Sequence, residues 1–350
     1  MKILFVGLGS VGQRHLQNIL TLRPKIEKIV GEKIELYSFY SGTARRSVIK
    51  NGKVKKVKDF DAYYRIKTLP SLATAMKTSP EVVFITNPSS LHVKTALLFA
   101  GLGSNLFIEK PLGTEHKGLD KLTDVIRKKR LVTMVGYQTR FNPVVGWVKD
   151  YVNKNFGKLN NASFVWHTYL PSHHTYENYS QGYAARKDLG GGVIMGLIHE
   201  VDLIYHLLGL PSNITAAGGK FSDLSIDVED TAKMLMKYRK NQKHFIVSLS
   251  LSYSQTHEVR GFVLQFNDAT VSVDLIANKA TLHSSKGKTI KVIKTKMERN
   301  DLFQEEVLHF FRCLSENSNT GIDVEEGIKS TKLALEFKKS ITLQQWKKIQ

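Results

Sequence analysis

The chain has 350 residues, 42% of them hydrophobic and 23% charged, which is an ordinary globular composition at a length that indicates two domains. Cys313 is the only cysteine, so an internal disulfide is excluded and a reducing compartment is expected. No apolar run is long enough to cross a membrane, and the strand that begins at residue 2 argues against a signal peptide. We therefore predict a cytoplasmic protein with no membrane partner.

The formal net charge is +20, from 51 lysine and arginine residues against 31 aspartate and glutamate residues. Such an excess can serve a nucleic-acid surface, attract anionic substrates or simply cover the protein. The basic residues are spread along the chain, in segments such as 50–56 and 127–130, without the interleaved aromatic residues of single-strand binders. We therefore favour a solvated basic surface, place attraction of anionic substrates second, and predict no nucleic-acid partner.

The first twelve residues, MKILFVGLGSVG, combine an apolar strand, a Gly-x-Gly-x-x-Gly pattern and the start of a helix. In this setting the first glycine permits a tight turn, the second lets a pyrophosphate approach the backbone, and the third allows close helix–strand packing. The free N–H groups at the helix start would hold the phosphates. The pattern predicts dinucleotide binding, and the alternative is a glycine-rich turn without a ligand. The residues of this expected site are Gly7, Gly9, Ser10, Val11 and Gly12.

The end of the next expected strand, residues 33–40, bears on which dinucleotide is bound. In such folds an acidic residue there binds the ribose hydroxyls, whereas an arginine accommodates a 2′-phosphate. This chain has Ser41 at that point, followed by Arg45 and Arg46. The pattern favours NADP over NAD; the alternative is that the two arginines only begin a solvated helix.

Strands and helices alternate through the rest of the N-terminal part. This alternation predicts a doubly wound parallel sheet with helices on both faces, the Rossmann arrangement, over residues 1–136. The expected strands are 81–86, 105–109 and 131–136, and the expected helices are 13–22, 91–100 and 119–130.

The pattern changes from residue 158 onward, where segments rich in β-branched and aromatic residues are separated by short polar turns. They predict a mostly antiparallel, open sheet, and two late helices are expected at 302–314 and 323–339. The chain is therefore predicted to be an α/β protein whose second domain, an α+β unit, covers residues 137–350. The expected strands are 162–169, 230–238, 244–253, 259–266 and 270–275.

Lys110 follows the apolar strand 105–109 and so lies at the carboxyl end of a strand, the edge at which open parallel sheets bind ligands. A partly desolvated lysine at such an edge can exchange protons, and Pro111 limits the conformations of the backbone around it. Oxidation of an alcohol needs one such base besides a hydride acceptor. The alternative is a solvated surface lysine.

Five motifs occur in order along nearly the whole chain: GLGSVGQRHL (7–16), TNPSSLH (86–92), EKPLG (109–113), GYQTRFNP (136–143) and YAARKDLGGGVIMGLIHEVD (183–202). Together they resemble the family of glucose–fructose oxidoreductase, inositol dehydrogenase and MocA, which are NAD(P)-dependent sugar and polyol oxidoreductases. The form of the last motif, with YAARKDLGGG, resembles members linked to surface-polysaccharide sugar biosynthesis.

The resemblance implies roles for individual residues. Lys110 would transfer the proton and, with Glu109, contact the cofactor. His199 would be the second catalytic residue and would hydrogen-bond the reacting hydroxyl. Gly196 stands where many members have an aspartate, so either Lys110 and His199 suffice or turnover has been lost. The segment that lines the nicotinamide would supply Thr86, Asn87, Pro88 and His92.

Substrate recognition is expected from residues around the domain junction and from a tyrosine-rich loop before the triple glycine. Aromatic faces and arginine side chains suit a sugar that carries a carboxylate or phosphate; the alternative is packing between domains or subunits. The expected contacts are Tyr137, Arg140, Asn142, Tyr183, Arg186 and His199.

A metal site is not expected. His199, Asp202 and His206 share one helical face by their spacing, but Asp202 is better explained as an anchor for the helix or for a neighbouring side chain.

The sequence thus predicts hydride transfer between NAD(P) and a CH–OH or C=O group of a sugar, which is anionic or nucleotide-activated in the leading interpretation. The second hypothesis is a non-catalytic NAD(P)-binding sensor of the same fold. The family resemblance also predicts a homodimer or homotetramer that forms through the C-terminal sheet.

Overall fold

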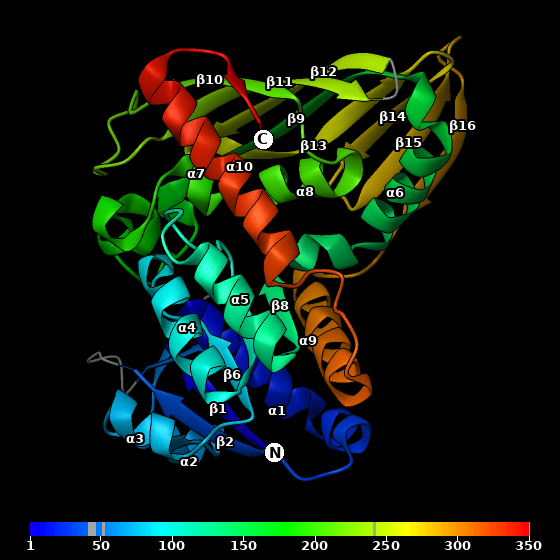
Figure 1. Ribbon diagram of the computed structural model, residues 1–350. Helices are drawn as coiled ribbons and strands as arrows, with labels where there is room; N and C mark the ends of the chain where they lie inside the picture. The colour runs from blue at the N-terminus through cyan, green and yellow to red at the C-terminus, as the bar shows by residue number, and fades with distance from the viewer. Residues whose placement is uncertain (41–46, 51–52, 241–242, 350) are drawn as a thin grey trace. The chain divides into compact units, whose positions relative to one another are not determined.

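The computed structural model (Figure 1) describes the chain except for residues 41–46, 51–52, 241–242 and 350. The chain divides into a first unit, Met1–Gln138 with Arg299–Ile328, and a second unit, Thr139–Glu298 with Lys329–Gln350. We expected two continuous domains, 1–136 and 137–350. The difference is the segment Arg299–Ile328, which joins the first unit because its apolar side chains complete that unit's core.

The first unit is built on a six-stranded sheet in the order β5-β2-β1-β6-β7-β8, in which all neighbouring strands are parallel, as predicted. Its inner strands are continuous apolar runs, because a strand covered on both faces has no side that meets water. The strand order reverses between β1 and β6, which makes their carboxyl ends the switch point at which such sheets bind ligands. The strands are β1 (Lys2–Val6), β2 (Glu35–Phe39), β5 (Lys67–Thr68), β6 (Val82–Ile85), β7 (Asn105–Glu109) and β8 (Thr133–Gly136).

Six helices and one short hairpin complete the described part of the first unit. Phe84 of β6 stacks on Phe107 of β7 with 4.7 Å between ring centres, and Phe310 meets both rings edge-on. Asn18 and Asn300 exchange side-chain hydrogen bonds of 2.9 and 3.3 Å, which join the first helix to the late one. The elements are α1 (Ser10–Val30), α2 (Phe60–Tyr64), α3 (Leu72–Lys77), α4 (His92–Leu102), α5 (Leu119–Lys129), α9 (Arg299–Glu316), β3 (Ser47–Lys50) and β4 (Lys53–Lys56).

The second unit contains a nine-stranded sheet in the order β16-β15-β14-β13-β9-β12-β11-β10-β17. All described neighbours are antiparallel except β9 and β12, so the sheet is mostly antiparallel, as predicted. The strands are β9 (Leu159–Tyr169), β10 (Asn213–Gly219), β11 (Thr231–Lys240), β12 (Lys243–Ser252), β13 (Ser254–Phe266), β14 (Ala269–Asp274), β15 (Lys279–Ser284), β16 (Thr289–Lys294) and β17 (Lys347–Lys348).

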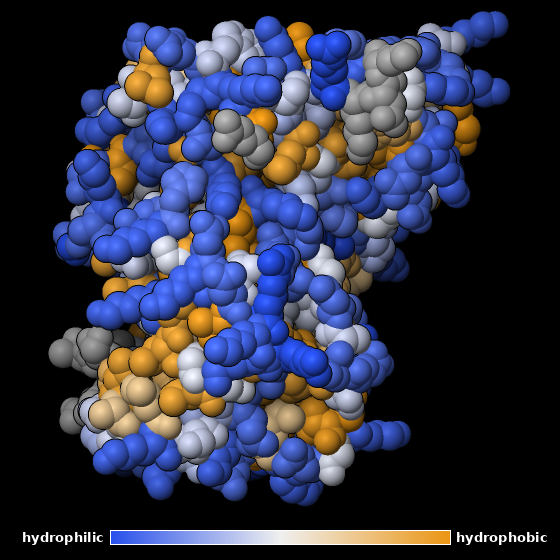
Figure 2. Space-filling model, viewed as in Figure 1, coloured by the Kyte–Doolittle hydropathy of each residue, from blue (hydrophilic) through white to orange (hydrophobic). Residues whose placement is uncertain are grey.

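Helices cover one face of this sheet, and the other face carries mainly polar side chains. Burial alternates along β12, where Phe245, Val247 and Leu249 are buried while Ile246 is 49% exposed. Figure 2 shows hydrophilic side chains over most of the visible surface. In the described part of the chain, no helix combines the length and apolar character needed to span a bilayer. The helices are α6 (Pro143–Asn155), α7 (Val193–Gly196), α8 (His199–Leu208) and α10 (Val324–Leu343).

Candidate functional site

The turn between β1 and α1 has a geometry that depends on glycine. Gly7 has φ +100°, and a Cβ there would lie 2.6 Å from the backbone nitrogen of Asn87. A Cβ on Gly12 would lie 2.5 Å from the carbonyl oxygen of Gly7. Gly9, by contrast, caps α1, and a Cβ on it would meet nothing within 4 Å. The fold therefore requires the outer two glycines, and the middle one leaves open space at the helix start, where Ser10 and Val11 form the first turn.

The carboxyl end of β6 lies against this turn. The Thr86 hydroxyl donates to the carbonyl oxygen of Gly7 at 2.6 Å. The Asn87 amide nitrogen donates to the Thr95 hydroxyl at 3.0 Å, whereas its Oδ1 is buried without a hydrogen-bond partner. An open glycine turn, a helix start and an unused amide oxygen at the switch point fit a dinucleotide.

His92 connects two of the expected cofactor segments. Its Nδ1 lies 2.7 Å from the Pro111 carbonyl oxygen and its Nε2 lies 2.8 Å from the Asn87 carbonyl oxygen. Burial lowers the pKa of His92, although both carbonyl contacts oppose this shift. Through these two contacts His92 connects the loops after β6 and β7, and Pro88 lies in the first of these loops.

Lys110 directly follows β7, at the same edge of the sheet as Thr86 and Asn87. β6 and β7 are parallel with Ile85 opposite Ile108, so their following residues leave the sheet together. Lys110 is half-buried, and its backbone N–H donates to Oε2 of the buried Glu109 at 3.1 Å. The structure thus brings the glycine turn, the β6 loop and Lys110 to one edge, while the assigned roles stay predictions. Ser41, Arg45 and Arg46 lie outside the described residues.

His199 is the first residue of α8 and is only 4% exposed. Its ring lies 6.3 Å from that of Trp166, and the Arg260 guanidinium stacks over Trp166 at 3.9 Å from the ring centre. Arg260 also donates to the Glu200 carboxylate at 2.6 Å. Trp166 and Arg260 were not predicted, because the pairing of β9 with β13 that brings them together has no local motif. Glu200 follows His199 directly in the sequence, but nothing in the motif indicated its ion pair with Arg260.

Gly196 has a specific structural partner. A Cβ at this position would lie 1.7 Å from the hydroxyl oxygen of Tyr253, which is buried and donates to the Gly192 carbonyl oxygen at 3.2 Å. The phenol therefore occupies the space that any side chain at position 196 would need. The absence of an aspartate at position 196 therefore goes together with the presence of Tyr253, whose side chain fills the space beside Gly196.

Three residues that we expected to contact the substrate are buried or bind other side chains of the protein. The Arg140 guanidinium forms a two-pronged ion pair with Asp202, at 2.6 and 2.8 Å, and its side chain is 5% exposed. The Asn142 side chain caps α6 through Val144 and donates to Asn278. Tyr137 is fully buried. These contacts favour structural roles over the substrate contacts that we expected.

Asp202 also accepts a hydrogen bond of 2.7 Å from Ser330, so it ties α8 to α10, as its proposed anchoring role requires. Burial and the nearby charges of Arg140 and Lys149 lower the pKa of His206 to about 3. His206 is therefore neutral at physiological pH.

Arg186 and Tyr183 lie in the loop of short 3₁₀ turns before α7. Arg186 pairs with Asp188 at 2.7 and 3.0 Å, and both side chains are substantially exposed. Together with Lys220, Arg186 lines an open cavity of about 610 Å³ within the second unit. It is the expected substrate arginine that remains accessible.

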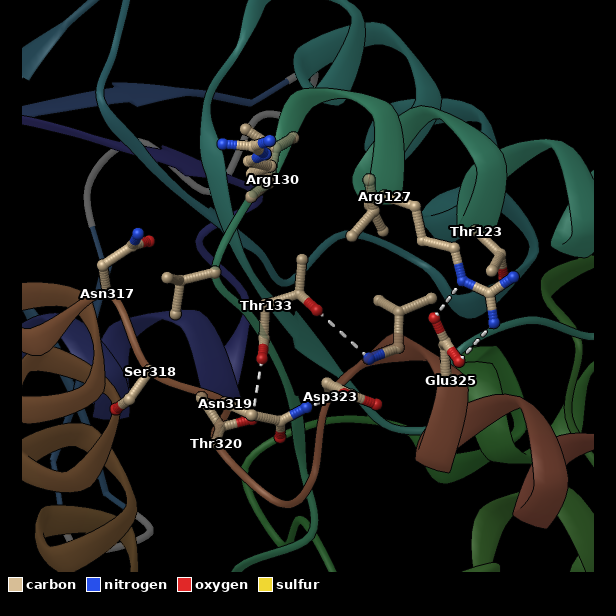
Figure 3. A pocket seen from close by; sticks show the side chains of 14 residues that line it. Thr123, Arg127, Arg130, Thr133, Asn317, Ser318, Asn319, Thr320, Asp323 and Glu325 are labelled. Carbon is tan, nitrogen blue, oxygen red and sulfur yellow. Dashed lines mark hydrogen bonds and ion pairs between the residues drawn. The ribbon is translucent and has the colours of Figure 1, made fainter.

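A smaller cavity of about 270 Å³ lies at the opposite edge of the first sheet, where β8 begins (Figure 3). Thr133 accepts a hydrogen bond from Thr320, and Arg127 forms two hydrogen bonds to Glu325. These contacts fasten the segment after α9 to the first unit. Within the first unit, the cavity lies away from the carboxyl ends of the strands, where the glycine turn and Lys110 lie.

Within the described residues, one group of side chains meets the distance requirement for a metal site: His15, Glu109 and Glu306. The distance from His15 Nε2 to Glu109 Oε1 is 2.6 Å. Two ligands bound at about 2.0–2.2 Å to one tetrahedral ion lie more than about 3 Å apart. The arrangement is therefore a hydrogen-bonded cluster.

The fold and the glycine turn define a dinucleotide-binding protein with a second, sheet-based unit. Residues 1–137 match the model of the oxidoreductase family with an NAD-binding Rossmann fold, and residues 149–275 match the GFO/IDH/MocA C-terminal domain. The chain belongs to the GFO/IDH/MocA oxidoreductase family, which confirms the predicted resemblance.

Similar proteins differ in how much of the chain they match. The scyllo-inositol 2-dehydrogenase (NAD+) of Bacillus subtilis is 22% identical over 345 residues, 93% of this chain and 92% of that protein. Levoglucosan dehydrogenase of Pseudarthrobacter phenanthrenivorans is 28% identical over 137 residues, 39% of this chain, and the chain spans only 35% of that protein's length.

Solved structures agree with the fold over the whole chain. A levoglucosan dehydrogenase in complex with NADH has a TM-score of 0.84 at 13% identity, covering 100% of this chain and 99% of that one. The WlbA dehydrogenase from Bordetella pertussis, in complex with NADH and UDP-GlcNAcA, has a TM-score of 0.78 at 16% identity, covering 100% and 98%.

Proposed function

We propose that the protein is an NAD(P)-dependent dehydrogenase or reductase that acts on a CH–OH or C=O group of a negatively charged sugar derivative. The observation that carries this proposal is the position of Lys110. It lies at the sheet edge that also holds the glycine turn and the unused amide oxygen of Asn87.

The residues of the first unit would divide the work. The start of α1, with Gly9, Ser10 and Val11, would hold the pyrophosphate through backbone N–H groups. The bound nicotinamide would supply the hydride acceptor or donor at its C4 atom. Lys110 Nζ would take the proton that the hydroxyl loses when its carbon is oxidised, and return it to the carbonyl oxygen in the reverse reaction.

The second unit supports an anionic substrate. Arg186 and Lys220 line its cavity, and a guanidinium recognises carboxylate or phosphate oxygens in two-pronged fashion. The WlbA dehydrogenase, one of the structural neighbours, holds UDP-GlcNAcA in its complex, and a nucleotide sugar or sugar acid is the substrate class that we propose here. His199 stays a predicted participant, tested separately by His199→Asn.

The test is deuterium transfer from C4-deuterated NADH and NADPH into neutral sugars, sugar acids and nucleotide sugars. Lys110→Ala should lower turnover at least about 100-fold and leave dinucleotide affinity nearly unchanged. Lys117→Ala, which removes an exposed lysine of the same unit, is the matched control and should have no effect. Full activity of Lys110→Ala would refute the proposed chemistry.

The cofactor is NAD or NADP, and the sequence around Arg45 and Arg46 favours NADP. Replacing both arginines with alanine should weaken binding of NADP and leave binding of NAD unchanged, because only NADP carries the 2′-phosphate.

A non-catalytic NAD(P) sensor is the second candidate, and one observation favours it: Tyr253 occupies the space for a side chain at Gly196, so no carboxylate can stand there. A sensor would bind the dinucleotide but pass no deuterium to any sugar in the panel.

We also propose a cytoplasmic homo-oligomer that forms through the open face of the nine-stranded sheet. That face exposes Leu235 (43%) and Ile246 (49%) on neighbouring strands. Ile246→Glu should reduce the mass measured by light scattering from the oligomer to one chain, whereas an unchanged mass would exclude this interface.

A further inference from the structure

Three buried ionisable side chains meet beneath the strand end that carries Lys110. His15 comes from α1, Glu109 is the last residue of β7, and Glu306 comes from α9, so all three belong to the first unit. Their exposed fractions are 0%, 4% and 0%. One nitrogen or carboxyl oxygen atom from each residue lies within 4.8 Å of the corresponding atoms of the other two.

The hydrogen bonds of this cluster are incomplete. His15 Nε2 and Glu109 Oε1 are hydrogen-bonded at 2.6 Å, but both carboxyl oxygens of Glu306 and Nδ1 of His15 have no partner. Phe107 and Phe303 pack against the His15 ring at 4.8 and 5.6 Å, so the surroundings are apolar. A buried carboxylate without a partner is costly, and the group takes up a proton instead.

The two carboxyl groups respond in opposite directions. Burial raises the pKa of Glu306 well above its ordinary value, and the charge on Glu109 adds to this shift. Burial also opposes ionisation of Glu109, but the hydrogen bond with His15 and the nearby positive charges lower its pKa overall. Two neighbouring carboxyl groups that share one negative charge behave in this way.

We propose that Glu306 stays protonated, donates a hydrogen bond to the Glu109 carboxylate, and thereby fixes the backbone from which Lys110 projects. Glu109 can accept this bond because each of its oxygens has two lone pairs, and its present partners are His15 and the Lys110 N–H. The proposed hydrogen bond requires a change in the side-chain torsion angles of Glu306, because neither of its carboxyl oxygens has a partner in the structure. Glu306 is thus a positioning residue, and this role rests on the proposed function of Lys110.

The protonation state has a direct spectroscopic test. At neutral pH the infrared spectrum of the wild-type protein should contain the carbonyl band of a protonated, buried carboxylic acid, which Glu306→Gln should remove. The glutamine keeps the shape and neutrality of the acid and can donate an N–H to Glu109. Absence of the band would overturn the proposal, as would one equivalent of bound metal ion that Glu306→Gln removes.

The positioning role is tested with a pair of variants. Glu306→Gln should keep kcat within about twofold, whereas Glu306→Leu, of similar volume but unable to donate, should lower kcat about tenfold with unchanged KM and dinucleotide affinity. Equal kcat for both variants would refute the positioning role. If the wild-type protein transfers no deuterium to any sugar, the proposed function fails, while the infrared band still decides the state of Glu306.

Discussion

The glycine turn of the first unit and the His199 segment of the second unit place polar groups by different means. In the turn, the backbone sets the geometry: Gly7 and Gly12 are needed because a Cβ would strike the neighbouring backbone. Around His199, side chains from distant strands set the geometry, as Arg260 does when it stacks on Trp166 and binds Glu200.

This difference explains why a motif predicts the local geometry in the first region but not the side-chain partners in the second. A glycine motif records a backbone constraint, and its meaning does not depend on partners far along the chain. Arginine and asparagine side chains can instead form hydrogen bonds with residues far along the chain. Arg140 donates to Asp202 in this way, and Asn142 donates to Asn278.

The largest effect should come from Gly7→Ala, which tests the backbone constraint directly. The left-handed φ of +100° and the contact of 2.6 Å should displace the β6 loop, so dinucleotide affinity should fall at least about 100-fold with a lower melting temperature. Gly9→Ala, whose Cβ meets open space, should keep the melting temperature and weaken only dinucleotide binding. Calorimetric titration and thermal melting measure both, and wild-type affinity in Gly7→Ala would exclude the turn as the site.

The next effect distinguishes the two arginines of the second unit. Asp202→Asn should lower the free energy of unfolding by about 3–5 kcal/mol, because it removes the negative charge that forms the buried ion pair with Arg140. Arg186→Ala removes an exposed ion pair and should leave the free energy of unfolding nearly unchanged, while weakening the binding of an anionic substrate. Urea unfolding and substrate KM provide the comparison. A large stability loss in Arg186→Ala would contradict it.

A smaller effect is expected where Gly196 meets Tyr253. Gly196→Ala should cost about 1–3 kcal/mol, because its Cβ would lie 1.7 Å from the phenol oxygen. In the Tyr253→Phe background the nearest ring carbon is 3.0 Å away, so the same substitution should cost less. A double-mutant cycle measures the coupling, and additive costs would show that the two positions do not compete for space.

The smallest effect concerns pH. The pKa of His206 falls from 6.5 to about 3 on folding. Between these pH values the unfolded chain therefore binds a proton at His206 and the folded protein does not. The contribution of neutral His206 to the free energy of unfolding is therefore fully present above pH 6.5 and is lost as the pH falls toward 3. Between pH 7 and pH 5.5 this loss should be about 1 kcal/mol. His206→Gln should flatten this slope in urea titrations at the two pH values, and an unchanged slope would assign the pH dependence to other groups.

Sequence patterns predict the fold well where an element is stabilised locally. The strand expected at 105–109 is β7, Asn105–Glu109, because its apolar run ends at a charged residue and a proline. The helix expected at 13–22 extends over Ser10–Val30, since its apolar face continues past Pro24. The placement of α9 on the first unit was missed, because helix periodicity shows an apolar face but does not identify the surface that this face covers.

The same limit applies to the candidate site. Gly7 and Lys110 were expected at strand ends from the local sequence pattern, whereas Thr86 and Asn87 were expected near the cofactor from the family resemblance. The structure brings all four to one edge because the strands are parallel. Glu306 was not found, because its partner Glu109 is almost 200 positions away and a single glutamate on a helix carries no signal of burial. His15 lies within the recognised motif at residues 7–16, so its role could have been suspected.

The return of α9 to the first unit has a consequence for biosynthesis. The six-stranded sheet leaves the ribosome within the first 140 or so residues, yet Phe303, Glu306 and Phe310 follow only after eight of the nine strands of the second sheet have been made. Until then, the aromatic layer of Phe84 and Phe107 lacks its cover. The domain that is translated first is therefore completed late, and a truncation before residue 299 would leave the nascent dinucleotide fold with an exposed apolar surface.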